Sequence, residues 1–166
     1  MSPEDRLYTD LRKLAIAFQV FEHSPVFTVA ESQAIKSEIV CLHTKNLFLK
    51  DAAGAFFLLT VPAAARIDLK NVPARIGSKR LSFGKPDDME RLIGVTPGSV
   101  TPLAMINAQP GSIQVVLDST LASSELAGVH PLRNTATITL AGSDIERLAC
   151  LWGHQVMVTD LPKLAS

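Results

Sequence analysis

The sequence predicts an α+β domain in which strands and helices mix around one sheet. Its 166 residues suit a single domain, residues 1–166, that is large enough to bury a sizeable core. Two neighbouring apolar runs predict a β-hairpin in the first third of the chain. The strands and helices expected after it follow one another irregularly, which favours a mixed α/β sheet over a doubly wound one.

The hairpin is predicted from residues 39–51 (IVCLHTKNLFLKD) and 55–61 (AFFLLTV), joined by a turn that ends in Gly54. Side chains alternate between the two faces of a strand, so His43 and Lys45 should share a face with Leu47, and Thr44 and Asn46 the other. Both faces are largely apolar, and we expect both to be covered.

Before the hairpin, the sequence predicts a helix, a short strand and a second helix. Ser2 can cap the first helix and Pro3 fits its first turn, with leucines recurring on one face. Residues 20–22 read as a strand. Thr28 then opens a helix to about residue 35, with Glu31 completing a capping-box pattern.

After the hairpin, residues 62–67 form a connection and the remaining elements are short. Pro86 starts a helix that Gly94 ends, and Ser143 with Glu146 predicts a capped last helix that stops at Gly153. The other expected elements are a rigid turn at 94–102, a helix at 101–107, strands at 112–117, 135–140 and 155–159, a helical or irregular stretch at 119–127, and a break at 128–131.

Charge is balanced over the chain but not along it. The formal net charge is zero, so no global field attracts nucleic acid, and no interaction with DNA is expected. Residues 66–85 nevertheless carry six basic side chains against one acidic. Such a run is either a solvated face or a phosphate-binding surface, whose candidates are Lys70, Arg75, Lys79 and Arg80.

The sequence also excludes several classes of location and chemistry. It has no signal-peptide pattern and no apolar run near the ~20 residues of a membrane span, so we expect a cytoplasmic protein with two buried thiols and no membrane partner. The Cys and His spacings match no common zinc pattern, and no G-x-S-x-G, P-loop or dinucleotide fingerprint is present. No metal or cofactor is predicted.

Three features remain as candidates for chemistry. Lys45 lies in an apolar strand, where an ammonium either finds an anionic partner or reaches water along its stem. The Gly-rich turn that contains Gly98 and Ser99 precedes a helix, where free N–H groups can hold an anion, or else it is simply a structural loop. His130 before Pro131 is either a structural hydrogen bonder or a functional residue.

Three segments together resemble a known family. KNLFLKD (45–51), GVTPGSVTP (94–102) and GVHPLRN (128–134) occur in the order found in the YbaK/ProX family of trans-acting aminoacyl-tRNA editing proteins. That family is similar to the editing insertion of bacterial prolyl-tRNA synthetase, and the resemblance runs over nearly the whole chain. It implies a mixed, partly barrel-like sheet surrounded by helices.

The resemblance also implies an activity: hydrolysis of the ester in mischarged Ala-tRNA(Pro), without a cofactor, and an association with prolyl-tRNA synthetase. A synthetase rejects smaller amino acids poorly, because a missing methylene is worth only about 1–3 kcal/mol in an apolar pocket. The alternatives are a Cys-tRNA(Pro) deacylase and a non-catalytic module of the same fold that binds tRNA or a small ligand.

Residue roles follow from the same resemblance. Lys45 matches the lysine that similar editing proteins require, and the Lys45–Asn46 pair resembles the alanine-specific branch. Asn46 and His130 would order the terminal nucleotide or the attacking water. The remaining residues implied are Thr44, Gly98, Ser99 and Gly128 at the substrate, and Lys70, Arg75, Lys79 and Arg80 at the acceptor stem. The sequence identifies no general base.

Overall fold

The computed structural model describes residues 1–26 and 29–165. Its helices are α1 (Pro3–Lys13), α2 (Val29–Glu38), α3 (Val72–Ile76), α4 (Pro86–Ile93), α5 (Ser119–Ala122), α6 (Gly142–Leu151) and the 3-10 turns η1 (Pro97–Ser99) and η2 (Pro102–Asn107). Its strands are β1 (Gln19–Glu22), β2 (Leu42–Asp51), β3 (Phe56–Pro62), β4 (Leu81–Phe83), β5 (Ile113–Asp118), β6 (Ala127–Val129), β7 (Ala136–Leu140) and β8 (Val156–Thr159).

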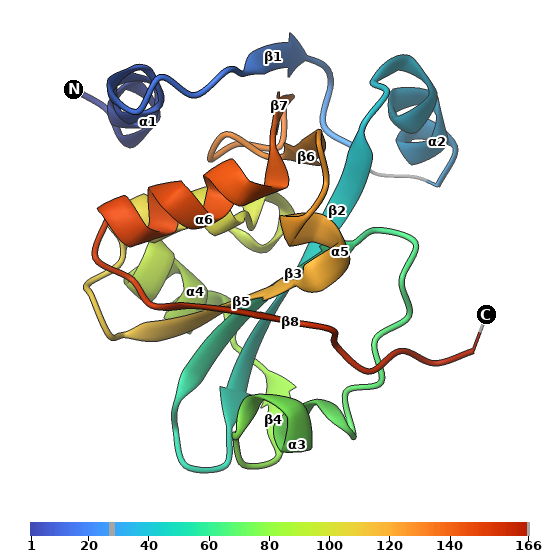
Figure 1. The fold of residues 1–166 in the computed structure, drawn as a ribbon, viewed down its shortest axis with the longest axis vertical. Helices are drawn as coiled ribbons and strands as arrows, with labels where there is room; N and C mark the ends of the chain where they lie inside the picture. Colours follow the sequence, from blue (N-terminus) through green and yellow to red (C-terminus); the bar gives the residue numbers. More distant parts are fainter. Residues whose placement is uncertain (27–28, 166) are drawn as a thin grey trace.

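The strands form one mixed sheet in the order β1-β7-β6-β2-β3-β5-β8, with β4 paired to β2 beside this path. The β2–β3, β6–β7 and β1–β7 pairs are antiparallel, whereas β2–β6, β3–β5 and β5–β8 are parallel. Helices lie around the sheet (Figure 1). The predicted α+β class with a mixed sheet is confirmed, and so is the hairpin, which is β2–β3.

Strand β2 has two different neighbours along the edge opposite β3. Leu42 and His43 pair with β6, and Leu49 to Asp51 pair with β4. Between these two ladders, residues 44–47 have β3 on one side and no described strand on the other. The backbone of β2 therefore borders an opening in the sheet where the sequence reads Thr44-Lys45-Asn46.

Both faces of the hairpin are covered, as its two-sided apolar pattern predicts. Phe48 and Leu58 belong to the larger core cluster, which α1, α4, η2 and α6 complete. Leu49 and Leu59 point the other way, into a second cluster closed by α3 and Leu161. The two clusters therefore pack against opposite faces of β2, next to its polar segment.

Local capping explains where several helices begin and end. Ser2 accepts a hydrogen bond from the Asp5 N–H (3.1 Å) at the start of α1, as predicted. Helix α4 spans the predicted residues and ends at Gly94, whose φ of 67° suits glycine. The predicted start of the second helix at Thr28 lies outside the described residues.

The predicted cap at Ser143 is wrong. Helix α6 begins one residue earlier, at Gly142, and its N-cap Ala141 makes no side-chain cap bond. A Cβ on Gly142 would collide with the Leu121 carbonyl oxygen. Close packing of α6 against α5, rather than a hydroxyl cap, therefore fixes this helix start.

Three short elements, α3, β4 and β6, were not predicted, and the expected helix at 101–107 is the 3-10 turn η2. Helix α3 and strand β4 lie within the basic segment, at the end of the molecule opposite α1 and α2 (Figure 1). Strand β6 occupies part of the expected break at 128–131. Each of these three short elements depends on tertiary contacts more than on a local sequence pattern.

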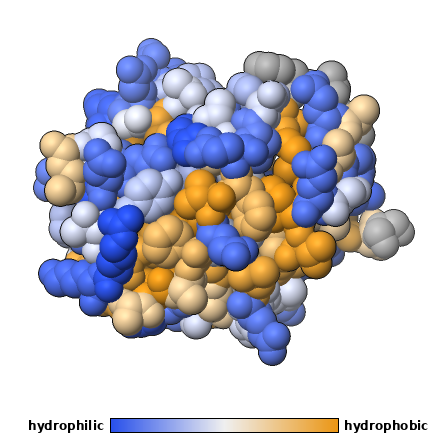
Figure 2. Space-filling model, turned by 90° about the horizontal axis from the view of Figure 1, so that it is seen from above, coloured by the Kyte–Doolittle hydropathy of each residue, from blue (hydrophilic) through white to orange (hydrophobic). Residues whose placement is uncertain are grey.

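The end of the molecule near β1, β7 and α2 is not uniformly polar. Figure 2 looks down on it and shows apolar residues at the surface in the middle and lower part of this face, with hydrophilic residues above and between them. Val26, which lies between β1 and α2, is 37% exposed. Among the described residues, no helix is long and apolar enough to cross a membrane.

Candidate functional site

A cavity of about 300 Å³ lies at the opening in the sheet beside β2. Its size is at the lower end of the range for small-molecule sites. It is lined by β2, by α2 and the segment before it, by η1 and by the β6–β7 region. The lining residues are His23, Val26, Ser32, Ile35, Lys36, His43, Thr44, Lys45, Asn46, Pro97, Gly98, Val100, Gly128, Val129, His130 and Thr137.

Two polar side chains of β2 bridge the opening to its other walls. The Thr44 hydroxyl donates to the Gly128 carbonyl (2.7 Å), which ties β2 to β6 just beyond their ladder. The Asn46 amide donates to the Val100 carbonyl (2.9 Å) and accepts from the buried Thr60 hydroxyl (2.7 Å). Asn46 is thus oriented from both ends before any ligand binds.

Lys45 lies between these two bridges and lines the cavity. Among the residues that the structure describes, neither Lys45 nor Lys36 has a hydrogen-bond or ion-pair partner. The described lining contains no Asp or Glu. Lys36 is exposed, whereas Lys45 is half-buried, so it is the ammonium of Lys45 that a polar or anionic group in the cavity would stabilise.

His130 has a defined tautomer. Its Nδ1 lies 3.0 Å from the Ala136 carbonyl oxygen. A carbonyl can only accept, so Nδ1 carries a proton and Nε2 of the neutral ring is an acceptor without a described partner. Burial lowers the pKa of His130, which keeps the ring neutral near pH 7. His130 can therefore accept a proton or a hydrogen bond inside the cavity.

Two further histidines line the cavity and were not predicted as site residues. His23 donates from Nδ1 to the Ser24 carbonyl (2.9 Å) and accepts at Nε2 from the Thr137 hydroxyl (2.9 Å). His43 donates from Nε2 to the Ile39 carbonyl (2.7 Å). The alternation of Thr135, Thr137 and Thr139 on β7 was a usable signal for Thr137, but no local pattern marks His23.

Cys41 lies behind the cavity, with Sγ 3.6 Å from His43 Nε2. Burial raises the pKa of this thiol, and His43 already donates its Nε2 proton to Ile39. The thiol therefore stays protonated and is not an activated nucleophile. Its role is to pack against Gly128, where an added Cβ would approach Sγ to 2.7 Å.

The predicted substrate residues separate into two groups. Thr44, Gly98 and Gly128 line the cavity with Lys45, Asn46 and His130. Ser99 is buried and does not belong to the lining. A Cβ on Gly98 would lie 3.4 Å from the Asn134 amide nitrogen, an ordinary contact distance, so η1 lies beside the loop that follows His130.

The predicted tRNA-binding residues lie elsewhere. Lys70, Arg75, Lys79 and Arg80 are all exposed, on and around α3 and just before β4. Strand β4 pairs with the far end of β2, at Asp51. Six residues of extended chain separate Lys45 from Asp51, a span of about 20 Å. Lys79 and Arg80, which contact the backbone or side chain of Asp51 and Ala52, are therefore about 20 Å from Lys45, and none of the four basic residues lines the cavity.

The described residues contain no cluster of three or more His, Cys, Asp or Glu placed to hold a metal ion. The cavity instead brings together a pre-oriented amide, a neutral histidine acceptor and two lysines that have no partner in the described part of the chain. Such an arrangement can hold a polar or anionic group and hydrogen-bond a water molecule beside it.

The model of the aminoacyl-tRNA editing domain matches residues 23–148, and the chain belongs to this family. It is 33% identical over 162 residues to the prolyl-tRNA editing protein ProX of Acetoanaerobium sticklandii, covering 97% of this chain and 99% of ProX. It is also 33% identical to the bovine prolyl-tRNA synthetase associated domain-containing protein 1, over 92% of each chain.

Solved structures support the same fold. A crystal structure of a candidate trans-editing enzyme for prolyl-tRNA synthetase superposes with a TM-score of 0.71 at 22% identity, over 99% of both chains. The hypothetical protein APE2540 gives a TM-score of 0.73 at 19% identity, over 94% of this chain and 98% of that one. The predicted resemblance to the YbaK/ProX type is confirmed.

Proposed function

We propose that this protein is a trans-editing aminoacyl-tRNA deacylase that hydrolyses mischarged tRNA(Pro), with Ala-tRNA(Pro) as its substrate. The observation that carries the proposal is Lys45, a cation with no partner among the described residues, in a cavity whose described lining has no carboxylate. The family and the ProX relative support the reaction class and the prolyl system. Prolyl-tRNA synthetase is the expected source of the substrate and the candidate partner.

The reaction adds water across the ester that joins the amino acid to the terminal ribose. The water oxygen bonds to the carbonyl carbon, the ester C–O bond breaks, and the ribose oxygen leaves with a proton. Lys45 would hold a phosphate or the carbonyl oxygen, where negative charge develops. Backbone N–H groups near Gly98 and Gly128 would assist it.

His130 and Asn46 would order the reacting water or the terminal ribose. The neutral His130 ring offers Nε2 as an acceptor, because Nδ1 is occupied by the Ala136 carbonyl. Asn46 retains a second amide hydrogen after donating to Val100. The ester is activated, so oriented water with a modest acceptor is sufficient chemistry.

Size would provide the discrimination against proline. A small cavity that accepts the alanyl group and excludes a proline ring rejects the correct product of the synthetase while removing the error. The basic residues Lys70, Arg75, Lys79 and Arg80 would bind the acceptor stem through phosphates.

The test is deacylation of Ala-tRNA(Pro), Cys-tRNA(Pro) and Pro-tRNA(Pro) by the wild type, Lys45→Met and Lys13→Met. Lys13 is an exposed lysine of α1, so its variant controls for loss of one positive charge. We expect loss of alanine only, slowed about 100-fold in Lys45→Met and unchanged in Lys13→Met. If cysteine is lost faster than alanine, Cys-tRNA(Pro) replaces Ala-tRNA(Pro) as the proposed substrate. If tRNA binds with salt-sensitive affinity but no ester is hydrolysed, the protein is a non-catalytic module.

A further inference from the structure

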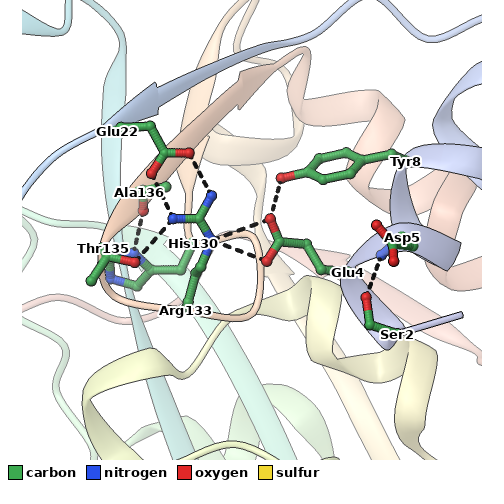
Figure 3. A network of polar contacts seen from close by, with 9 residues as sticks. All are labelled: Ser2, Glu4, Asp5, Tyr8, Glu22, His130, Arg133, Thr135 and Ala136. Atoms are coloured by element: carbon green, nitrogen blue, oxygen red, sulfur yellow. Dashed lines mark hydrogen bonds and ion pairs between the residues drawn. The ribbon is translucent and has the colours of Figure 1, made fainter.

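One arginine outside the cavity connects three distant parts of the chain. Arg133 lies in the loop 130–135 between β6 and β7, and its guanidinium sits between the carboxylates of Glu4 in α1 and Glu22 in β1 (Figure 3). It donates from Nη1 and Nη2 to Glu22 (both 2.7 Å) and from Nε to both oxygens of Glu4 (3.0 and 3.1 Å).

The network is more ordered than an ordinary surface ion pair. Arg133 also donates to the Thr135 hydroxyl (3.0 Å), and the Tyr8 hydroxyl donates to Glu4 (2.6 Å). The side chains of Arg133 and Glu4 are only 31% and 27% exposed, whereas that of Glu22 is 69% exposed. A part-buried pair with Glu4 and a forked pair with Glu22 together fix the direction of the guanidinium as well as its distance, which a lone exposed pair does not.

The loop that Arg133 holds is strained and borders the cavity. Leu132 has a φ of 73°, a left-handed conformation that a leucine rarely adopts and that surrounding contacts must maintain. On one side of Arg133 the loop presents His130 to the cavity. On the other side it presents Asn134 to Gly98 in η1.

We propose that Arg133 is a positioning residue: its contacts with Glu4 and Glu22 set the loop 130–135 and thereby aim the His130 ring into the cavity. The inference rests on the proposed function for its kinetic consequence, but the placement of His130 is measurable without it. Arg133 itself does not line the cavity, so it acts only through the loop.

A purely structural tie makes a different prediction. If Arg133 only fastened α1 to the sheet, its loss would lower the melting temperature and leave the folded enzyme unchanged. If it positions His130, its loss lowers kcat more than it changes KM, because the substrate still finds Lys45. The loosened loop also admits water to His130, which moves the pKa of the ring back up toward its ordinary value.

The experiment compares wild type with Arg133→Met, Arg133→Lys and Glu22→Gln, each at a temperature where circular dichroism shows it folded. Arg147→Met is the matched control, because Arg147 makes an ion pair with Asp144 and donates to the Leu14 carbonyl away from the cavity. The readouts are kcat and KM for deacylation and the titration of His130 followed by NMR.

We expect kcat to fall about tenfold or more in Arg133→Met, less in Arg133→Lys and Glu22→Gln, and not at all in Arg147→Met. The His130 titration should move in the same order. A lower melting temperature with kcat and titration as in wild type overturns the proposal. If Arg133→Met does not fold, the same criterion applies to the two milder variants.

The two hypotheses fail separately. A wild type that hydrolyses no aminoacyl-tRNA rejects the proposed function, while a shifted His130 titration in the Arg133 variants still supports the positioning role. An active wild type whose Arg133 variants keep kcat and the His130 titration retains the proposed function and rejects the positioning role.

Discussion

The two ends of β2 carry polar side chains in opposite circumstances. Lys45, near the start of the strand, lines a cavity and has no described partner. Asp51, at the other end, is 8% exposed and accepts from the N–H groups of Ala53 (3.0 Å), Ala55 (2.9 Å) and Lys79 (3.0 Å). Hydrogen bonds from these N–H groups, that of Lys79 most of all, hold the pKa of Asp51 below its usual value.

The difference separates a polar residue whose hydrogen bonds stabilise the fold from one that no described residue pairs with. The Asp51 carboxylate accepts hydrogen bonds from the turn between β2 and β3 and from Lys79 before β4, so its removal should destabilise the fold. Lys45 is held by a rigid strand, and no described residue pairs with its charge, so its removal should damage binding or chemistry alone.

The largest expected effect is that of Lys45→Met on activity. It should lower kcat/KM for Ala-tRNA(Pro) about 100-fold, which corresponds to about 2.7 kcal/mol of transition-state stabilisation. The melting temperature should stay the same or rise, because the substitution removes an ammonium from a partly apolar site. A clear loss of stability would mean that Lys45 is structural and that the two ends of β2 are alike.

Asp51→Asn should show the reverse pattern. An amide keeps one acceptor oxygen and turns an NH₂ group toward backbone donors, so the melting temperature should fall by several degrees. Deacylation below the transition should remain near the wild-type rate. Asp87→Asn, an exposed carboxylate of α4, is the control for charge. Loss of activity in a folded Asp51→Asn protein would contradict the separation.

Thr60→Val tests whether the fold also prepares the cavity end. Thr60 is fully buried and donates to Asn46 Oδ1 (2.7 Å). Losing this bond leaves the amide oxygen without its donor and should cost about 1–2 kcal/mol in the free energy of unfolding, measured with urea. It should also lower kcat/KM severalfold, since Asn46 loses one of its two constraints. Unchanged kinetics would mean that the bond from Thr60 is not needed to orient Asn46.

Much of the fold could be predicted because its signals are local. The hairpin has apolar strands around an Asp…Gly turn, and α4 has Pro86 at its start and Gly94 at its end. Strands β4 and β6 have three residues each and exist through their partners in β2 and β7. No sequence window shows such pairing, and the start of α6 is set by contact with Leu121.

The site was predictable only in part, for a similar reason. Lys45, Asn46, Gly128 and His130 meet at one cavity because β2 leaves β6 after His43, which is a property of the whole sheet. Their grouping came from the family resemblance, not from spacing. His23 carries no signal in the sequence, because only the tertiary fold brings it to Thr137.

The exposed basic surface should give a smaller effect than either end of β2. Replacing Lys79 and Arg80 together with alanine should raise KM for tRNA a few-fold without changing kcat, because these residues lie about 20 Å from Lys45. The dependence of log KM on log salt should become shallower by roughly 0.7–0.9 for each phosphate that the variant no longer neutralises. Arg12 and Lys13, exposed at the end of α1, give the matched double variant. Equal KM values and salt slopes in the two double variants would mean that the basic segment 66–85 is only a solvated face.

Near neutral pH, a change of pH itself has the smallest effect, and it separates the cavity from the Asp51 turn without a mutation. Burial lowers the pKa of His130, with His23 adding to the shift and the Ala136 bond opposing it, so the ring stays neutral somewhat below the ordinary value of about 6.5. Activity should hold at pH 6.5 and fall only as the pH drops through the lowered pKa of His130 in the folded protein. Stability begins to fall earlier, from about pH 6.5 downward, because His130 is protonated in the unfolded chain first.

The pKa of Asp51 is also lowered, so the contribution of Asp51 to stability is complete above the unfolded value of about 3.9 and is lost as the pH falls below it. A pH–rate profile measured beside melting temperatures should therefore show activity lost while the Asp51 turn is still intact. Coincident loss of activity and of most of the stability, both below pH 4, would mean that His130 does not need to be neutral for catalysis.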